Sequence, residues 1–219
     1  AQFTYNNSTY TIIDTPGHVD FSPEMERAIQ VMDFAVIIIS AADGVEGHTE
    51  TVWQLLRKYQ VPTFFFLNKI DREGTNVADV INEIRENLTE DVYDFTDSFT
   101  KGVMEVELIE FIAERDEDLF EHYMEKGYDK DLWLEKAKEM IKQHQLYACL
   151  AGSALHDKGV AEFLDLLDQL TETSYSDESD FAARVYKIRH DENGNRITYL
   201  KSISGLLAVR DDVKIGEQT

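Results

Sequence analysis

Four polar segments of this sequence carry residue types that bind ligands, and each one directly follows a short apolar run. The runs are residues 11–13, 34–39, 63–67 and 146–150, and the segments after them are Asp14-Thr15-Pro16-Gly17-His18, residues 40–44, Asn68-Lys69-Ile70-Asp71 and Ala151-Gly152-Ser153-Ala154. Such runs, rich in β-branched and aromatic residues, indicate parallel strands that are buried on both faces. The carboxyl ends of parallel strands share one edge of the sheet, where ligands bind. We therefore expect the four segments to surround one crevice.

Each segment alone has an ordinary explanation. Asp14-Thr15-Pro16-Gly17 is a plausible turn, because Pro fixes φ and Gly supplies conformational freedom. Asn-Lys-x-Asp occurs by chance in many chains, and Gly152-Ser153-Ala154 is uninformative alone. The order of the segments, their spacing and their shared position after apolar strands carry the inference.

Helical patterns separate the apolar runs. Each pattern places its apolar residues on one face; these are Met25, Ala28, Ile29 and Met32, then Thr49, Val52, Trp53 and Leu56, then Val77, Val80, Ile81, Ile84 and Leu88, then Val160, Phe163, Leu164 and Leu167. Strands that alternate with helices predict an α/β fold with a doubly wound parallel sheet. Residues 3–12 predict an antiparallel hairpin at the edge of that sheet.

Two further regions interrupt or follow the alternation. Residues 89–145 predict an acidic, mostly helical insertion, so that the first domain spans residues 1–172. Residues 173–180 are a Ser- and acid-rich linker. Residues 181–189 and 197–203 predict a second hairpin, and a further strand is expected near residues 213–215. Residues 181–219 are therefore expected to be the start of a β domain.

The charge balance restricts the partners. The chain has 219 residues, with 43 Asp and Glu against 21 Lys and Arg and a net charge of −22. Phosphate backbones and anionic membranes call for clustered cations, so we expect no direct DNA binding and no membrane partner. Residues 83–142 carry 19 acidic and 8 basic residues, half of that net charge. We interpret them as a solvated helical surface, with a surface that avoids RNA or meets a basic protein as the alternative.

Cysteine content and hydropathy indicate a compartment. The chain has a single cysteine, Cys149, so an internal disulfide is excluded, which fits a reducing cytosol. Cys149 lies in an apolar run. No apolar stretch approaches the ~18 residues of a membrane span, and no signal peptide opens the chain. We expect a cytoplasmic protein.

The spaced motifs resemble those of one family. Asp14-x-x-Gly17, Asn68-Lys69-x-Asp71 and Gly152-Ser153-Ala154 resemble the third, fourth and fifth motifs of GTP-binding proteins. The longer string from Asp14 to Phe21, which includes His18, resembles translational GTPases of the elongation factor G type. This resemblance covers nearly the whole chain. It implies a P-loop-NTPase-like, mostly parallel sheet with helices on both faces, a following β-barrel domain, GTP or GDP with Mg²⁺ as ligands, and the ribosome as partner.

The resemblance implies roles at the base end of the nucleotide. Asp71 would accept hydrogen bonds from N1–H and the exocyclic amine of guanine, a pair of donors that adenine lacks. Asn68 would donate to N7 and tie loops together. The alkyl stem of Lys69 would cover one face of the ring. Backbone N–H groups near Ser153 and Ala154 would meet the guanine O6.

The resemblance also implies roles at the phosphate end. Asp14 would hold Mg²⁺ through water, since hard cations prefer carboxylate oxygen. The Gly17 N–H would contact the γ-phosphate and sense its loss. His18 would position the attacking water, the role that Gln has in other GTPases.

One part of the family pattern does not occur in this sequence. There is no Gly-rich loop ending in Gly-Lys-Ser/Thr, and the first switch region is missing too. We therefore expect an incomplete GTP-binding domain that has the base-reading residues without the phosphate cradle. The chain alone is expected to lack GTPase activity and to bind nucleotide feebly.

Within the family, the 80 residues between Asp71 and Gly152 are a shorter insertion than elongation factor G typically carries. With Lys69-Ile70-Asp71, residues 64–66 and residues 205–213, this length resembles tetracycline-resistance ribosomal protection proteins, which use GTP on the ribosome to dislodge tetracycline. Residues 51–53 and 71–72 favour an elongation factor G translocase. Peptide-chain release factor 3 fits less well. A non-hydrolysing paralogue that binds guanine nucleotide or the ribosome is the remaining alternative.

Overall fold

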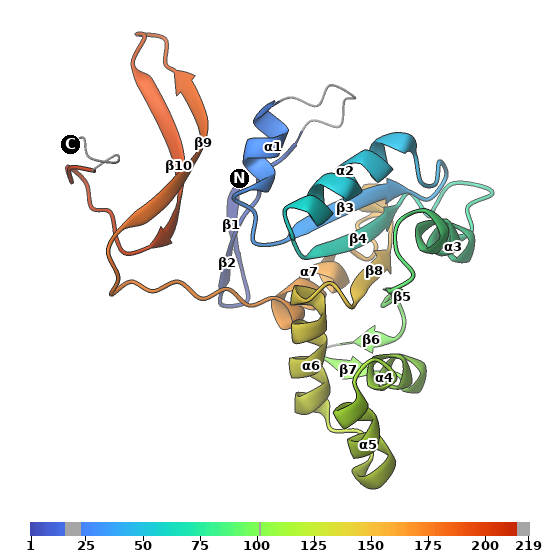
Figure 1. Ribbon diagram of the computed structural model, residues 1–219. Coiled ribbons are helices and arrows are strands. Elements are labelled where there is room, and N and C mark those ends of the chain that lie inside the picture. The colour runs from blue at the N-terminus through green and yellow to red at the C-terminus, as the bar shows by residue number, and fades with distance from the viewer. Residues whose placement is uncertain (16–22, 101, 214–219) are drawn as a thin grey trace. The chain divides into compact units, whose positions relative to one another are not determined.

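A computed structural model describes residues 1–15, 23–100 and 102–213 (Figure 1). The chain divides into two compact units, of which the first consists of Ala1–Val19 and Met32–Glu172. The second consists of Asp20–Val31 and Thr173–Thr219. None of the helices in the described ranges combines the length and the apolar character needed to cross a membrane.

A four-stranded parallel sheet forms the centre of the first unit. Its strands are β3 (Ala35–Ser40), β4 (Thr63–Asn68), β8 (Tyr147–Ala151) and β5 (Val92–Asp94), in the order β3-β4-β8-β5. All three pairings are parallel. The sequence analysis expected β4 and β8 to be buried on both faces, and this is confirmed, since Phe64, Phe65, Leu67 and Cys149 have no exposed surface.

Helices cover opposite faces of this sheet. Successive side chains of a strand point to opposite faces, so Phe65 and Phe66 of β4 lie on different sides. Trp53 of α2 (Gly47–Lys58) packs 5.6 Å from Phe65, and Phe163 of α7 (Val160–Leu170) packs 5.3 Å from Phe66. The expected α/β fold with helices on both faces is therefore confirmed. A further helix, α3 (Val77–Asn87), precedes β5, as its apolar face predicts.

The first apolar run was predicted to join the parallel sheet, and this is wrong. Residues 11–13 contribute only Thr11, the last residue of β2 (Ser8–Thr11), which pairs antiparallel with β1 (Gln2–Tyr5). Within the described residues the two strands form a sheet of their own. Among the β2 side chains only Tyr10 is even half-buried, so this strand lacks the apolar surface that a doubly buried strand requires.

The expected hairpin at the start of the chain is observed, but it is held by a helix. The Tyr5 hydroxyl donates to Asp165 at 2.7 Å, and the Tyr10 hydroxyl donates to Asp168 at 3.1 Å. Both carboxylates belong to α7, which packs on the central sheet. Polar side chains on α7 therefore position β1 and β2.

Strand β3 differs from the expectation on one face. Ala35, Ile37 and Ile39 are buried, whereas Val36 is 40% and Ile38 is 65% exposed. The run was predicted to be buried on both faces. Within the described residues, this second face of β3 is left uncovered. An apolar run shows that a strand can be buried on both faces, but it does not show whether another element covers each face.

The predicted insertion at residues 89–145 contains three helices and three short strands. The helices are α4 (Val106–Ala113), α5 (Glu117–Lys126) and α6 (Lys130–Lys142), and a hairpin of β6 (Phe99–Thr100) and β7 (Val103–Met104) precedes them. Strand β5 also lies within these residues but belongs to the central sheet, which the sequence analysis missed. Trp133 is fully buried in a core that continues from the insertion to Phe64 of the sheet.

The described part of the second unit, residues 23–31 and 173–213, contains one short helix and a long hairpin. These are α1 (Pro23–Ile29), β9 (Ala182–His190) and β10 (Arg196–Ser204), with β9 and β10 antiparallel. The hairpin agrees with the expected strands at residues 181–189 and 197–203. The side chains of Arg184 and Lys201 donate to the carbonyls of Gln30 and Val31, which joins the end of the α1 segment to the hairpin. Val213 is not in a strand, and residues 214–215 of the further strand expected there lie outside the described residues.

Candidate functional site

The carboxyl ends of β4 and β8 lie side by side. Leu67 of β4 is in register with Ala151 of β8, and the N–H of Gly152 donates to the Leu67 carbonyl at 2.8 Å. The N–H of Ile70 in turn donates to the Gly152 carbonyl at 3.2 Å. The loop after β3 joins the same edge, because the Ala41 N–H donates to the carbonyl of Asn68 at 2.7 Å. Three of the four polar segments therefore meet at one edge, as the parallel arrangement requires.

Asn68 ties two of these loops together. Its Oδ1 accepts hydrogen bonds from the Lys69 N–H at 2.8 Å and from the Ala154 N–H at 2.9 Å. Lys69 and Ala154 are far apart in the sequence, and one side-chain oxygen fixes both backbones. The Asn68 amide nitrogen is a donor that can serve a ligand, since the oxygen is used by the protein.

Lys69 has an unusual backbone conformation that follows from this arrangement. Its φ is +66°, in the left-handed region that non-glycine residues enter infrequently and mostly at constrained sites. Its ammonium Nζ lies 3.9 Å from Asp43 Oδ2, and the side chains of Lys69 and Asp43 are 42% and 51% exposed. An ion pair this exposed contributes little stability, so we assign it to orientation of the lysine. The Ser40 hydroxyl is the largest influence that holds the pKa of Asp43 below its usual value, and the positive charge of Lys69 adds to it.

Asp71 presents an ionised carboxylate at the same edge. The Ser153 hydroxyl is the largest influence that holds the pKa of Asp71 below its ordinary value, and the charge of His156 adds to it. His156 Nε2 lies 3.6 Å from Asp71 Oδ2, an ion pair only when the imidazole is protonated. Ser153 Oγ is buried and makes no hydrogen bond of ordinary geometry within the described residues. Asp71 is therefore a hydrogen-bond acceptor near a hydroxyl that has spare hydrogen-bonding capacity.

The loop after β8 is closed and tightly packed. The N–H groups of Ser153 and Lys158 each donate to the other residue's carbonyl, at 2.9 and 3.0 Å. A Cβ at Gly152 would lie 2.3 Å from the Lys158 carbonyl oxygen and 2.7 Å from the Phe66 ring. Only glycine fits there, so this loop has little freedom to displace Ser153 and Ala154.

The structure describes fewer of the residues predicted at the phosphate end. Asp14 is exposed. Gly17 and His18 lie outside the described residues. Among the residues that the structure does describe, no group of three or more His, Cys, Asp or Glu side chains is gathered as a metal-binding cluster. The expected contact of Asp14 with Mg²⁺ through water stays a prediction.

Two residues of this edge were missed by the sequence analysis. His156 is two residues after Ala154, and a titratable side chain in an already suspected loop was the available signal. Asp43 lies in one of the four polar segments but was given no role, because nothing in its neighbours indicates that Lys69 would face it. Both contacts join residues that are distant in sequence, so only the fold brings them together.

A parallel sheet whose polar loops gather at the carboxyl edge defines a ligand-binding α/β domain. The family model for the elongation factor Tu GTP-binding domain matches residues 1–173, and the chain belongs to that family. The resemblance to translational GTPases is thereby confirmed.

Relatives of known type match the whole chain. A tetracycline resistance protein TetM from Streptococcus pneumoniae, encoded on a transposon, is 32% identical over 227 residues and covers 100% of this chain. TetS from Listeria monocytogenes is 31% identical over 232 residues, with the same coverage. The chain spans 35% of the length of each of these relatives.

A solved structure shows the same fold. A crystal structure of a protein from Thermus thermophilus superposes with a TM-score of 0.80 and covers 94% of this chain and 37% of that one. Its sequence identity to this chain is 20%, so the likeness shows the fold alone.

Proposed function

We propose that this chain is the guanine-reading part of a ribosome-dependent GTPase of the tetracycline resistance type. The observation that carries the proposal is the double hydrogen bond of Asn68 Oδ1 to Lys69 and Ala154. It joins the two loops that the family resemblance assigns to the guanine base. The family match and the named relatives support the same assignment.

The base-end chemistry follows from hydrogen-bonding capacity. Ionised Asp71 offers two acceptor oxygens, which match the adjacent N1–H and amine of guanine. Adenine presents no such pair of donors, so a carboxylate that the bound base shields from water would be left without partners, which lowers the affinity for adenine. The free amide nitrogen of Asn68 donates to N7, the stem of Lys69 covers the ring, and the N–H groups near Ser153 and Ala154 meet O6.

The phosphate-end chemistry depends on residues 14–18. Mg²⁺, when bound, neutralises phosphate charge, and Asp14 is the carboxylate proposed to hold it through water. Gly17 is proposed to sense the γ-phosphate through its N–H, and His18 to orient the attacking water. Since the printed sequence contains no Gly-x-x-x-x-Gly-Lys-Ser/Thr, we propose that this chain alone binds nucleotide feebly and does not hydrolyse GTP.

Base selection is tested by changing the acceptor at Asp71. In a complete gene product that contains this chain, Asp71→Asn is expected to weaken GDP binding by about 100-fold or more. The substitution replaces one of the two carboxylate oxygens, which accept hydrogen bonds, with an amide NH₂ that would face the N–H donors of guanine. Xanthosine diphosphate carries a carbonyl where guanine has its amine, so its affinity should rise relative to that of GDP. Competition against a fluorescent GDP analogue measures both.

A matched control separates base reading from folding. Asp43→Asn removes a carboxylate at the same edge that faces Lys69, and it should leave the preference for GDP over xanthosine diphosphate unchanged. Equal preference in the wild type and the Asp71→Asn variant would remove Asp71 from the base site.

The cellular role is tested separately. The complete gene product is proposed to raise tetracycline tolerance when expressed in a sensitive bacterium, and His18→Ala should abolish that rise while leaving the protein folded. An unchanged tolerance together with ribosome-stimulated GTP hydrolysis would support the translocase of the elongation factor G type instead. GTP binding without hydrolysis on ribosomes would support the non-hydrolysing paralogue.

A further inference from the structure

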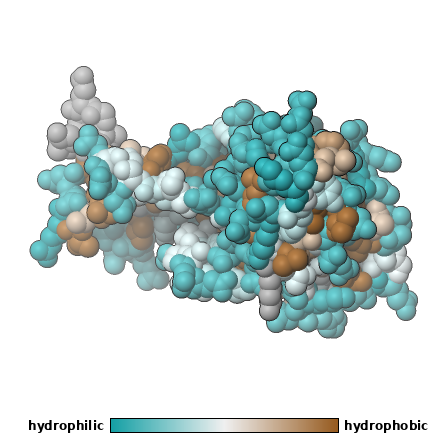
Figure 2. Space-filling view, turned by 90° about the horizontal axis from the view of Figure 1, so that it is seen from below, coloured by the Kyte–Doolittle hydropathy of each residue, from teal (hydrophilic) through white to brown (hydrophobic). Residues whose placement is uncertain are grey.

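One carboxylate that has no proposed contact with nucleotide is bound to the backbone of the loop after β3. Hydrophilic residues cover most of the face drawn in Figure 2, and most carboxylates among the described residues are exposed to solvent. Glu83 of α3 differs from them, because it is half-buried and its Oε2 accepts a hydrogen bond from the Val45 N–H at 2.9 Å. The two residues are 38 positions apart in the sequence, so the fold makes this contact.

The Glu83 carboxylate lies directly against the backbone of that loop. Gly44 is buried and has a φ of +72°, and a Cβ on it would lie 2.2 Å from Glu83 Oε2. Glycine at this position therefore lets the carboxylate reach the Val45 N–H. Helix α3 is itself anchored through its buried apolar residues. Glu83 thus ties the loop to an element that is packed on the core.

Residues 41–45 are attached to the protein at both ends. At the start, the Ala41 N–H donates to the carbonyl of Asn68 at 2.7 Å. At the end, the Val45 N–H donates to Glu83. One attachment joins the segment to a residue that is proposed to contact the base, and the other joins it to α3. A segment of five residues that is held at both ends has little freedom to move.

The middle of this segment faces Lys69. The N–H groups of Asp43 and Gly44 both donate to the Ser40 carbonyl, at 3.1 and 2.9 Å, which closes a turn. Asp43 Oδ2 lies 3.9 Å from Lys69 Nζ. A lysine side chain loses rotational entropy when it is ordered, and ordering it before a ligand arrives lowers the entropic cost of binding. The position of Asp43 therefore influences how much of that cost the ligand meets.

We propose that Glu83 is a positioning residue for guanine nucleotide, which acts through residues 41–45 and Asp43 on the side chain of Lys69. The inference rests on the proposed function, in which the stem of Lys69 covers one face of the base. With Glu83 in place, Asp43 holds the lysine ammonium and the stem is extended before nucleotide binds. Without Glu83, the Val45 N–H loses its acceptor, the segment moves, and the nucleotide itself must order the lysine.

The test measures how fast a fluorescent GDP analogue leaves the complete gene product that contains this chain, after mixing with excess unlabelled GDP. Glu83→Ala is expected to raise the dissociation rate about three- to fivefold, the upper range of what an exposed ion pair contributes. Glu83→Gln keeps an oxygen that can accept from the Val45 N–H, so its rate should stay within about twofold of the wild type. Asp43→Asn leaves α3 unchanged and should raise the rate as much as Glu83→Ala does.

A double substitution separates positioning of Lys69 from general loosening of the loop. Lys69→Met keeps an apolar stem and removes the charge that meets Asp43. If Glu83 acts through that charge, adding Glu83→Ala to Lys69→Met should change the dissociation rate by less than about 1.5-fold. The preference for GDP over xanthosine diphosphate should be the same in all these variants, because an apolar stem covers either purine.

A matched control removes another carboxylate from the same helix. Glu86 is exposed, and Glu86→Ala should change the dissociation rate by less than about 1.5-fold. Circular dichroism shows whether each variant is folded. If Glu83→Ala does not fold, Glu83→Met takes its place with the same expected rise, since methionine is a good helix former and cannot accept the hydrogen bond in the same way.

Two results would overturn the proposal. One is an unchanged dissociation rate when Glu83 is replaced by a residue without an acceptor oxygen. The other is a rise that is equally large in the Lys69→Met background, which would show that Glu83 acts on the loop as a whole. Both leave the effect of Asp71→Asn on base preference intact, whereas a wild type without preference for GDP would remove the proposed function and this inference together.

Discussion

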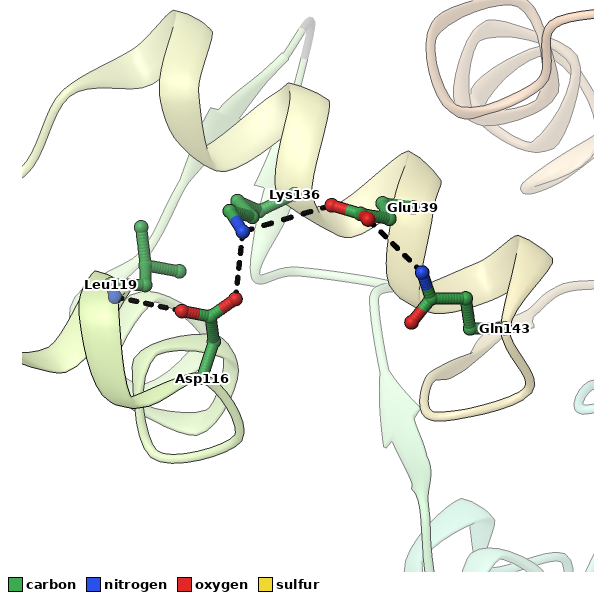
Figure 3. Close-up of polar contacts among 5 residues, drawn as sticks. All are labelled: Asp116, Leu119, Lys136, Glu139 and Gln143. Atoms are coloured by element: carbon green, nitrogen blue, oxygen red, sulfur yellow. Dashed lines mark hydrogen bonds and ion pairs between the residues drawn. The ribbon is translucent and has the colours of Figure 1, made fainter.

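The loops after β4 and β8 are held together mainly by backbone hydrogen bonds, to which the Asn68 side chain adds, whereas partly exposed side-chain pairs attach the start of α5 (Figure 3) and the β1–β2 hairpin to their neighbours. Between the loops, amide and carbonyl groups of Leu67, Ile70 and Gly152 bond one another, and a buried strand lies directly behind each loop. On α5, Asp116 meets Lys136 while both side chains are roughly a quarter exposed. Buried backbone bonds tolerate little displacement, and partly exposed ion pairs contribute little individually.

This contrast assigns different tasks to the two regions. The loops after β4 and β8 carry Asn68, Asp71 and Ser153, which are proposed to contact the base, and a closed backbone would hold them in a fixed geometry. At the start of α5 and at the β1–β2 hairpin, side-chain pairs attach an element to its neighbour. Substitutions should therefore have unequal effects in the two regions.

The largest expected effect is at Gly152. Gly152→Ala places a Cβ 2.3 Å from the Lys158 carbonyl oxygen and 2.7 Å from the Phe66 ring, so the loop or β4 must shift. We expect a loss of about 2–4 kcal/mol in the free energy of unfolding, typical of overpacking against backbone. Urea denaturation followed by circular dichroism measures it.

A glycine in open space is the control for that substitution. A Cβ at Gly47, the first residue of α2, meets nothing within 4 Å, and Gly47→Ala should change stability by less than about 0.5 kcal/mol. If Gly152→Ala were equally mild, the loop after β8 would be freer than its contacts indicate, and the contrast between the two regions would fail.

A smaller effect is expected at Asp116, where one carboxylate has two tasks. Asp116→Ala removes both the α5 cap and the ion pair with Lys136, and it should cost about 1–2 kcal/mol. Asp116→Asn keeps an oxygen that can cap the helix and loses only the charge, so it should cost about 0.5 kcal/mol. The difference between the two variants in urea denaturation isolates the cap.

The pH dependence of this pair has a definite sign. The hydrogen bond from Lys136 holds the pKa of Asp116 below its usual value, so the folded state favours the ionised carboxylate. Its contribution is present above the unfolded pKa of about 4 and is lost as pH falls through the lower folded pKa. If Asp116→Asn proved as damaging as Asp116→Ala, the ion pair would outweigh the cap.

Much of the fold could be predicted because buried parallel strands have a distinctive sequence. The unbroken apolar runs of β4 and β8 are uncommon outside doubly covered sheets, and polar residues follow directly where each strand ends. Strand β5 was missed because Val92–Asp94 is only three residues long and is stabilised by its partner β8. Val36 and Ile38 were expected to be buried because sequence reports a residue's hydrophobicity and not its neighbours.

The candidate site could be predicted only in part, for a related reason. The motif residues Asn68, Lys69 and Asp71 are local in sequence, and their order with Ser153 indicates the shared edge. The contact of His156 with Asp71 depends on how the loop after β8 turns back, which no short motif encodes. The proposed roles of Asp14, Gly17 and His18 stay predictions.

A smaller effect than that of Asp116→Ala is expected at Tyr10, where the β1–β2 hairpin meets α7. Burial is the largest influence that raises the pKa of Tyr10 to about 12, and the negative charge of Asp168 adds to it. The folded state therefore favours the neutral phenol, and unfolding releases a tyrosine with a pKa of about 10. The stabilisation is complete below pH ~10 and declines as pH rises from ~10 to ~12.

Tyr10→Phe tests this sign. The variant keeps the ring that stacks on Phe3 at 5.3 Å and removes the hydroxyl that titrates. Below pH ~9 it should cost about 0.5–1 kcal/mol, the worth of one partly exposed hydrogen bond. Between pH ~10 and ~11 the wild type should lose stability more steeply than the variant in urea denaturation, since other tyrosines and lysines titrate equally in both. Parallel pH profiles would mean that folding leaves the pKa of Tyr10 unchanged, which would contradict its burial and its contact with Asp168.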